Sequence, residues 1–307
     1  MTSGRSPVVG TIALLAAAAS IGAGAIAVRA AFDHGAEAGP LVAVRFIGAG
    51  LLFCLVLPWL LARGPRPLPW RGMAFAVAAG LTLLVGARAE FEGLARLPAA
   101  VLVLLLFVAP IWVALIERIL WRRPVARATI LAIALVIVGV TTMVAPWHAD
   151  VDLVGVAFGL VGSVALAAFF VLMEHSQQTT PTSLAISAAL VAAGAVSFLL
   201  DPGALTSELG DSGVMPYAAA IAAAFAAWGL LASIGLDATT AVTAAIVSAS
   251  EPVFVALLAF VLLGESLSAR EIGGGAVVMT GVLLGALGPT LAARRPPPQE
   301  GALASSR

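Results

Sequence analysis

The chain is a succession of apolar blocks, each about 20 residues long and separated from the next by a short polar break. An α-helix rises about 1.5 Å per residue, so a block of this length can cross the roughly 30 Å of hydrocarbon in a bilayer. Of the 307 residues, 61% are hydrophobic and 10% are charged, whereas roughly 25% are charged in a soluble domain. The sequence therefore predicts an integral membrane protein, with no stretch left for a soluble domain.

Charges and clusters of proline and glycine mark the ends of ten candidate spans. The first could pass for a signal peptide, but its apolar run from Val8 to Val28 is too long and further spans follow, so we expect a retained helix. The predicted fold class is an all-α integral membrane protein with ten transmembrane helices. The spans are expected at 8–29, 41–62, 72–93, 98–119, 128–146, 153–173, 183–200, 215–235, 240–262 and 272–291.

The distribution of charge predicts how the chain crosses the membrane. If the N-terminus is cytoplasmic, most of the 16 basic residues, all of them arginine, fall in cytoplasmic segments, and acids such as Asp33 and Asp201 fall outside. The bias of basic residues toward the cytoplasm places both termini there, in a bacterial-type inner membrane. The polar tail, 293–307, contains three consecutive prolines and is expected to be disordered.

Two short stretches, "LFVAPIWVAL" at 106–115 and "SASEPVFVAL" at 248–257, match at the offset between Pro110 and Pro252, which is 142 residues. The same offset pairs Gly93-Leu94 with Gly235-Leu236. We therefore predict two five-span repeats, 1–147 and 148–292. Because five is odd, the second repeat enters the membrane in the opposite orientation, an arrangement typical of secondary transporters. Each proline removes a backbone donor about halfway along its span and is expected to bend the helix and act as a hinge.

The stretch "AAIVSASEPVFVALLAFVLLGESLSAREIGGGAVVMTGVLL" resembles the closing part of the EamA family in the drug/metabolite transporter superfamily. The shared features are small and polar residues, a proline, an apolar run to Gly264-Glu265, and a last helix with glycines. Arg45 is similar to an arginine near the start of that family's second helix. The resemblance covers 8–291 and implies a ten-helix secondary transporter that exports amino acids or other metabolites. The charged stretch "ARAEFEGLAR", 87–96, departs from the pattern and implies either a distinct substrate preference or an unusual outer rim.

Glu251 lies in the middle of an otherwise uncharged span, beside Pro252. An ionised carboxylate at that depth is costly, so it must face a wet cavity, have a partner or hold a proton. Ser248 lies about one turn earlier on the same helical stripe. Glu251 is therefore either a counter-ion for a substrate amine or a proton-coupling group, or it serves structure by bonding backbone groups near Pro252 or pairing with an arginine.

The other polar candidates each have a functional and a structural interpretation. Arg45 either binds a substrate carboxylate or snorkels outward to water. Arg88 and Glu92 are spaced i, i+4, so they can pair and gate the outer mouth, or they form a solvated helix end. Mid-span Trp112 and Trp228 either stack on a substrate in a cavity or pack between helices.

Several function classes are disfavoured. An intramembrane enzyme using Glu251 is an alternative, but the histidines lie in loops or span ends and no aspartate pair lies mid-span. The chain has one cysteine, Cys54, and no lysine-bearing phosphate-binding loop, so we expect no disulfide, no metal, no cofactor and no nucleic-acid partner. A facilitative channel or uniporter also remains an alternative function.

The glycine motifs at 155/159 and 281/285 allow close packing of helices within the bundle or in a homodimer.

Together these patterns predict a secondary transporter that exports a small zwitterionic or amphiphilic metabolite by alternating access. The small-molecule substrate is expected to bind between the two halves, and protons are the candidate coupling ion. No residue is expected to be catalytic.

Overall fold

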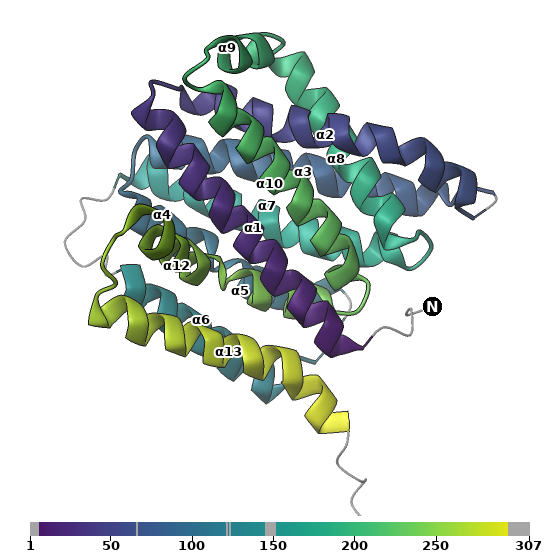
Figure 1. Ribbon diagram of the computed structural model, residues 1–307. Helices are drawn as coiled ribbons and strands as arrows, with labels where there is room; N and C mark the ends of the chain where they lie inside the picture. The colour runs from purple at the N-terminus through teal and green to yellow at the C-terminus, as the bar shows by residue number, and fades with distance from the viewer. Residues whose placement is uncertain (1–5, 66, 121, 123, 145–151, 294–307) are drawn as a thin grey trace, which may run out of the picture.

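The computed structural model describes residues 6–65, 67–120, 122, 124–144 and 152–293. Within these residues the secondary structure is helical, with no strand, and the helices form one bundle (Figure 1). The tail at 294–307 and the expected repeat boundary at 147/148 lie outside the described residues.

Ten segments are long and apolar enough to cross a membrane, as the sequence predicts. The fourth span is made of two helices, and so is the ninth; short α9 lies in the connection between α8 and α10. The bounds are α1 (Pro7–Asp33), α2 (Ala38–Arg63), α3 (Trp70–Leu94), α4 (Ala99–Leu106), α5 (Ala109–Leu120), α6 (Arg127–Val144), α7 (Leu153–Gln177), α8 (Thr182–Leu200), α9 (Ala204–Gly210), α10 (Met215–Leu236), α11 (Ala241–Ser248), α12 (Glu251–Leu263) and α13 (Ala269–Ala293).

The fourth and ninth spans are interrupted at matching places, and this corrects the expectation that each proline bends a continuous helix. The turns between helices fall at 107–108 and 249–250, and Pro110 and Pro252 occupy the second position of the helix that follows. A proline fits the first turn of a helix because the N–H it lacks would have no partner there. The break therefore precedes each proline.

The hydrogen bonds around the two turns repeat at the offset of 142 residues. The Val108 N–H donates to the carbonyl of Leu105 at 3.3 Å, and the Ser250 N–H donates to that of Val247 at 3.0 Å. One turn later, Ile111 donates to Val108 at 2.9 Å and Val253 donates to Ser250 at 3.0 Å. Two spans broken at the same register by the same bonds show that the chain is built from two copies of one five-span unit.

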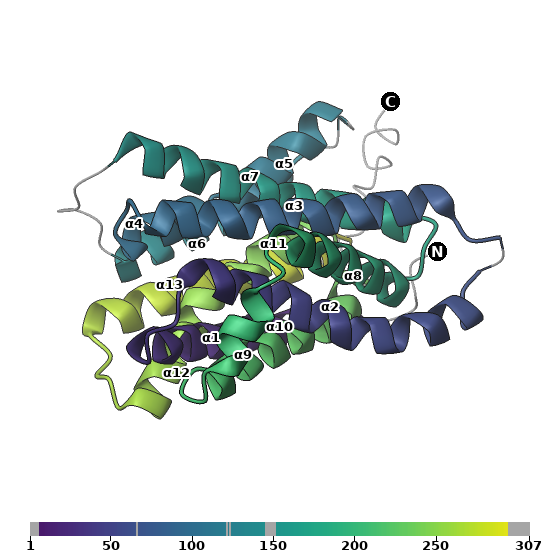
Figure 2. The same cartoon turned by 90° about the horizontal axis from the view of Figure 1, so that it is seen from above.

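The main helix pairings join one repeat to the other. α3 packs on α7 and α1 packs on α10, while α2 packs on α8 and α6 packs on α13. Figure 2 shows α8 between α2 and α3. The glycine motifs are used inside the bundle: a Cβ at Gly281 would lie 2.9 Å from the carbonyl oxygen of Ala132, and one at Gly159 would lie 2.7 Å from the Leu105 side chain. These motifs bring helices of the same chain close together.

The outer surface of the bundle carries many large apolar side chains. Leu55 is 79% exposed, Leu199 75% and Val261 70%, all within candidate spans. A soluble protein rarely exposes so much contiguous apolar surface, whereas hydrocarbon accepts it.

The two ends of the bundle are named for use below. The near end is the one where α1 begins and α2 ends, and the far end is opposite to it. α1 starts and α13 ends toward the same side (Figure 1).

Candidate functional site

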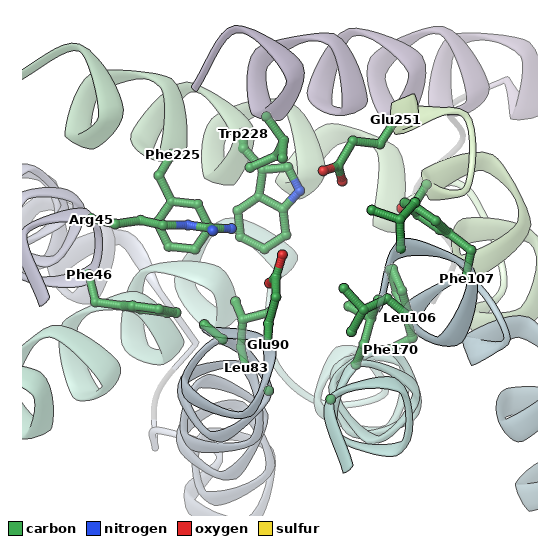
Figure 3. Close-up of a pocket in the computed structure, with 17 residues that line it drawn as sticks. Arg45, Phe46, Leu83, Glu90, Leu106, Phe107, Phe170, Phe225, Trp228 and Glu251 are labelled. Carbon is green, nitrogen blue, oxygen red and sulfur yellow. The ribbon is translucent and has the colours of Figure 1, made fainter. Parts of the chain in front are cut away.

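A cavity of about 130 Å³ lies where the two interrupted spans face each other. Helices of both repeats build it, and charged, aromatic and small side chains meet there (Figure 3). Its lining consists of Ile21, Arg45, Phe46, Leu83, Gly86, Ala87, Glu90, Val103, Leu106, Phe107, Gly162, Leu166, Phe170, Phe225, Trp228, Ser248 and Glu251. We call this the central cavity.

Three charged side chains point into the central cavity from three different helices. Arg45 comes from α2, Glu90 from α3 and Glu251 from the first residue of α12 (Figure 3). No ion pair joins these three side chains to one another in the described part of the chain, whereas Arg29 pairs with Glu265 and Arg96 pairs with Glu92 outside the cavity. The two acids and the arginine thus share one space without closing on one another, which leaves room for a ligand between them.

Aromatic rings hold the guanidinium of Arg45 in place. Its Cζ lies 4.3 Å from the ring centroid of Phe225 and 5.9 Å from that of Phe46. Phe225 in turn stacks on Trp228, with ring centroids 5.0 Å apart and planes 2° apart. A ring face attracts a cation, but it does not use the N–H donors that lie in the plane of the guanidinium. Those donors can still bind a carboxylate in pairs. The guanidinium is therefore oriented while its N–H groups remain available to an anionic ligand group.

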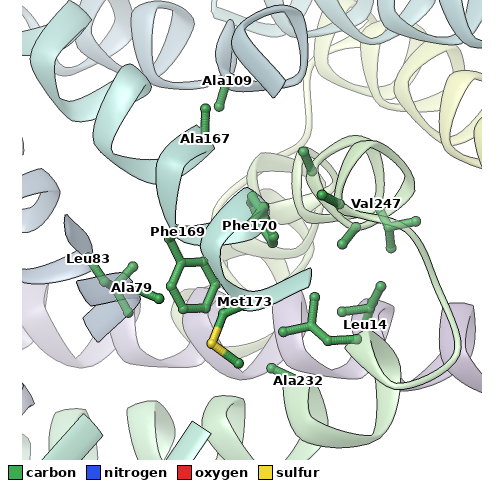
Figure 4. Packing of buried hydrophobic residues seen from close by; sticks show 14 of the residues in the cluster. Leu14, Ala79, Leu83, Ala109, Ala167, Phe169, Phe170, Met173, Ala232 and Val247 are labelled. Atoms are coloured by element: carbon green, nitrogen blue, oxygen red, sulfur yellow. The ribbon is translucent and has the colours of Figure 1, made fainter. Parts of the chain in front are cut away.

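The central cavity extends from the middle of the bundle toward the far end. Arg45 lies about 11 Å along α2 from the far end, and Glu90 about 6 Å along α3 from it, at about 1.5 Å per residue. Phe170 and Trp228 are the lining residues nearest the near end. Around Phe170 the side chains pack closely; Leu14, Phe169 and Met173 are 3%, 1% and 0% exposed (Figure 4). Met173 lies about one turn nearer the near end than Phe170 on α7, so the apolar core continues from the cavity toward the near end.

Polar bonds tie helices together at the near end. The Ala241 N–H, at the start of α11, donates to Oε2 of Glu174 on α7 at 2.7 Å. The hydroxyl of Thr182 donates to Oδ1 of Asp237 at 2.9 Å, which joins α8 to the end of α10. The near end is thus held by hydrogen bonds as well as by packing.

The structure brings together some of the residues predicted from sequence and leaves out others. Arg45, Ser248, Glu251 and Trp228 line the central cavity. Trp112 does not; it packs against the apolar core, and its buried Nε1 has no hydrogen-bond partner. Pro110 and Pro252 follow the two helix breaks next to the cavity but do not line it.

Arg88 and Glu92, for which the sequence left open a pair or a solvated helix end, do not pair with each other in the structure. Glu92 instead accepts a hydrogen bond at 2.7 Å from Arg96, one turn further along the chain, and neither residue lines the cavity. The Nε and Nη2 atoms of Arg88 are buried and have no hydrogen-bond partner. A residue four positions away on either side satisfies i, i+4 spacing equally well, so spacing alone did not choose the partner of Glu92.

Glu90 is the charged residue of the site that was not predicted from the sequence, because it falls in the charged stretch 87–96, for which a distinct substrate preference and an unusual outer rim both stayed open. A signal was present: Leu83, Gly86, Ala87 and Glu90 lie on one face of a helix by their spacing, and all four line the cavity. Among the described residues, no three of histidine, cysteine, aspartate and glutamate are placed to hold a metal ion.

Comparison with known proteins gives consistent matches along most of the chain. A model of the EamA-like transporter family matches residues 8–145 and 153–286, one match for each repeat. An uncharacterized transporter from Archaeoglobus fulgidus is 27% identical over 250 residues, which cover 80% of this chain and 87% of the relative. A solved crystal structure of a protein superimposes with a TM-score of 0.68 at 18% identity, over 92% of this chain and 99% of the other. That similarity shows a shared fold.

Proposed function

Because the chain belongs to the EamA-like transporter family, and is therefore a multi-pass membrane transporter and not an enzyme, we propose that it is a secondary active exporter of small zwitterionic amphiphiles such as amino acids. The observation that carries this proposal is the central cavity, in which one arginine and two glutamates from both sides of the repeat interface face a common space. Substrate sites of transporters with inverted repeats lie at such interrupted helices near the midplane.

The chemistry of the lining favours a substrate with an anionic group, a cationic group and an apolar part. Arg45 can bind a carboxylate through paired N–H donors. Glu90 and Glu251 can each accept hydrogen bonds from an ammonium group. Phe225 and Trp228 offer apolar faces to the remainder of the molecule. The volume of about 130 Å³ favours a small ligand.

Two acids facing one arginine also provide a basis for coupling substrate export to the movement of protons. When both carboxylates are ionised, the arginine balances only one of them, and an uncompensated charge inside the membrane is costly. The second carboxylate therefore needs either a substrate ammonium or a proton. We assign this exchange to Glu251, which starts α12 directly after the helix break. Arrival of the ammonium releases the proton to solution, and departure of the substrate requires a proton to return.

Alternating access follows from the two interrupted spans. We take the near end as the cytoplasmic end, since it holds Arg63 and Arg71, so that both termini lie in the cytoplasm of a bacterial-type inner membrane. The packed near end then corresponds to an outward-facing state. Rocking of the two repeats about the breaks before Pro110 and Pro252 would separate the near-end helices and close the far end.

The test is efflux from loaded proteoliposomes, screened over amino acids and related amphiphiles, with and without a pH gradient. We expect gradient-driven efflux by the wild type, and we expect Glu251→Gln to lose it while keeping exchange of substrate. Glu92→Gln is the matched control, because Glu92 pairs with Arg96 away from the cavity. Gradient-driven efflux by Glu251→Gln at the wild-type rate would remove Glu251 from coupling, and flux that ignores the gradient in the wild type would favour a uniporter or channel.

A further inference from the structure

A second cavity, of about 270 Å³, lies between α2 and α8. The lining consists of Ile47, Gly50, Leu51 and Cys54 of α2, Val191, Gly194, Ala195 and Phe198 of α8, and Leu205 of α9. Cys54 supplies the one polar side-chain atom of this lining. We call it the lateral cavity, because it belongs to the outer wall of the bundle.

The lateral cavity is continuous with the surface of the bundle that faces the bilayer. Leu51 is 56% exposed and Phe198 46%, and the thiol-bearing Cys54 is exposed as well. Ile47 to Cys54 fall in the middle of the 26-residue α2, and α8 is also a membrane span. The α2 side of the opening therefore lies at the depth of the hydrocarbon, and Phe198 near the end of α8 and Leu205 of α9 extend the lining toward the far end.

The close approach of two backbones creates the hollow. A Cβ at Gly50 would lie 3.2 Å from Cα of Gly194, and one at Gly194 would lie 2.7 Å from the carbonyl oxygen of Phe46. Where two helices touch through glycine, the larger residues on either side stand apart and leave space beside the contact. About one turn before Gly50 on α2, Arg45 and Phe46 line the central cavity.

Water is a poor occupant for this space. A buried water molecule needs two to four polar partners, and the lateral cavity offers a single thiol. A charged or zwitterionic substrate would lose its hydration without compensation. Hydrocarbon matches both the lining and the surroundings, because methylene groups of the bilayer already lie against the rim of the opening.

We propose that the lateral cavity is a binding site for one acyl chain of a membrane phospholipid, which inserts between α2 and α8 from the bilayer. The chain packs against the turn of α2 next to Gly50 and so supports the position of Arg45 on the opposite side of the helix. The site is independent of the transported substrate, so the proposal does not rest on the proposed function.

The test uses the full-length protein in a bilayer that contains a phospholipid with a photoreactive diazirine in its acyl chain. After illumination, peptide mass spectrometry locates the modified residues. We expect Ile47–Cys54 and Val191–Phe198 to be labelled more heavily than 261–263 of α12, an apolar surface of similar or greater exposure outside both cavities. Equal labelling of the two surfaces would overturn the proposal.

Filling the cavity gives a second, independent measurement. Ala195→Phe places a ring in the lateral cavity, whereas Ala276→Phe adds the same ring to an exposed position of α13 outside it. We expect Ala195→Phe to lower labelling of both segments to the level of α12, and to remove one tightly bound phospholipid from the detergent-purified protein in native mass spectra. Retention of that phospholipid would contradict the proposal, as would crosslinks between the Cys54 thiols of two chains, which would make the cavity an interface between copies of the protein.

Discussion

At the scale of single residues, Arg45 lies between aromatic rings on one side and the two acids of the central cavity on the other. Its guanidinium lies over the Phe225 ring, and its N–H groups face the acids across the central cavity. We expect Arg45→Lys to weaken substrate binding by about tenfold, about 1.4 kcal/mol, because lysine keeps the charge but loses the planar pair of donors. Isothermal titration with the transported substrate measures this change.

Arg96→Lys is the matched control for Arg45, since Arg96 also lies over an aromatic ring, 5.1 Å from Phe158, but outside the cavity. Unchanged affinity in Arg45→Lys would mean that only the positive charge matters. A loss of equal size in Arg96→Lys would mean that the effect is structural.

Sequence identified single charges deep inside spans, because a charge in hydrocarbon needs a reason. Glu251 stands out for that reason, whereas Arg45, near the start of its span, stands out by its resemblance to an arginine of the EamA family. Both line the central cavity. Glu90 was missed because it lies near a span end, where water is close and an ionised side chain costs little free energy. Trp112 shows the opposite error: an aromatic residue in the middle of a span packs as well in a core as in a site, so its position carries little information.

At the scale of elements, the start of α11 is one of the points where a hydrogen bond joins helices at the near end. Its first N–H donates to the carboxylate of Glu174, and such a bond to a charged group contributes about 1.5–3 kcal/mol. We expect Glu174→Ala to lower the hydrogen-exchange protection of α11 by roughly tenfold or more. Glu174→Gln, which keeps an acceptor oxygen, should stay close to the wild type.

Equal protection of α11 in the wild type and in Glu174→Ala would show that the bond does not hold the near end closed. If Glu174→Gln behaves like Glu174→Ala, the charge and not the hydrogen bond fastens α11. The experiment needs no substrate, so it tests the near end separately from transport.

The helices themselves were predictable, whereas their interruptions were predictable only in part. Apolar length defines the ten spans, and the offset of 142 residues defines the repeat. The two prolines pointed to the right spans and the right depth. They did not locate the break, because a proline is compatible both with a kink and with the first turn of a new helix.

At the scale of the whole molecule, the two repeats pack on each other along most of their helices. The strongest helix pairings cross from one repeat to the other, and the central cavity lies between them. Sequence did not predict these pairings, because helices that are apolar all round do not mark which face meets which neighbour. Small residues such as Gly281 decide the contacts by letting backbones approach, and their partners are visible only in the fold.

The central claim is that the central cavity opens to the two sides of the membrane in turn. The direct test places one thiol in it, with Ser248→Cys in a Cys54→Ala background, and applies a membrane-impermeant thiol reagent from either side of oriented proteoliposomes. We predict labelling from the far side without substrate, a shift toward the near side when substrate and gradient drive turnover, and no passage of reagent across the membrane. Labelling from one side under every condition, or passage of the reagent through the protein, would contradict alternating access at this site.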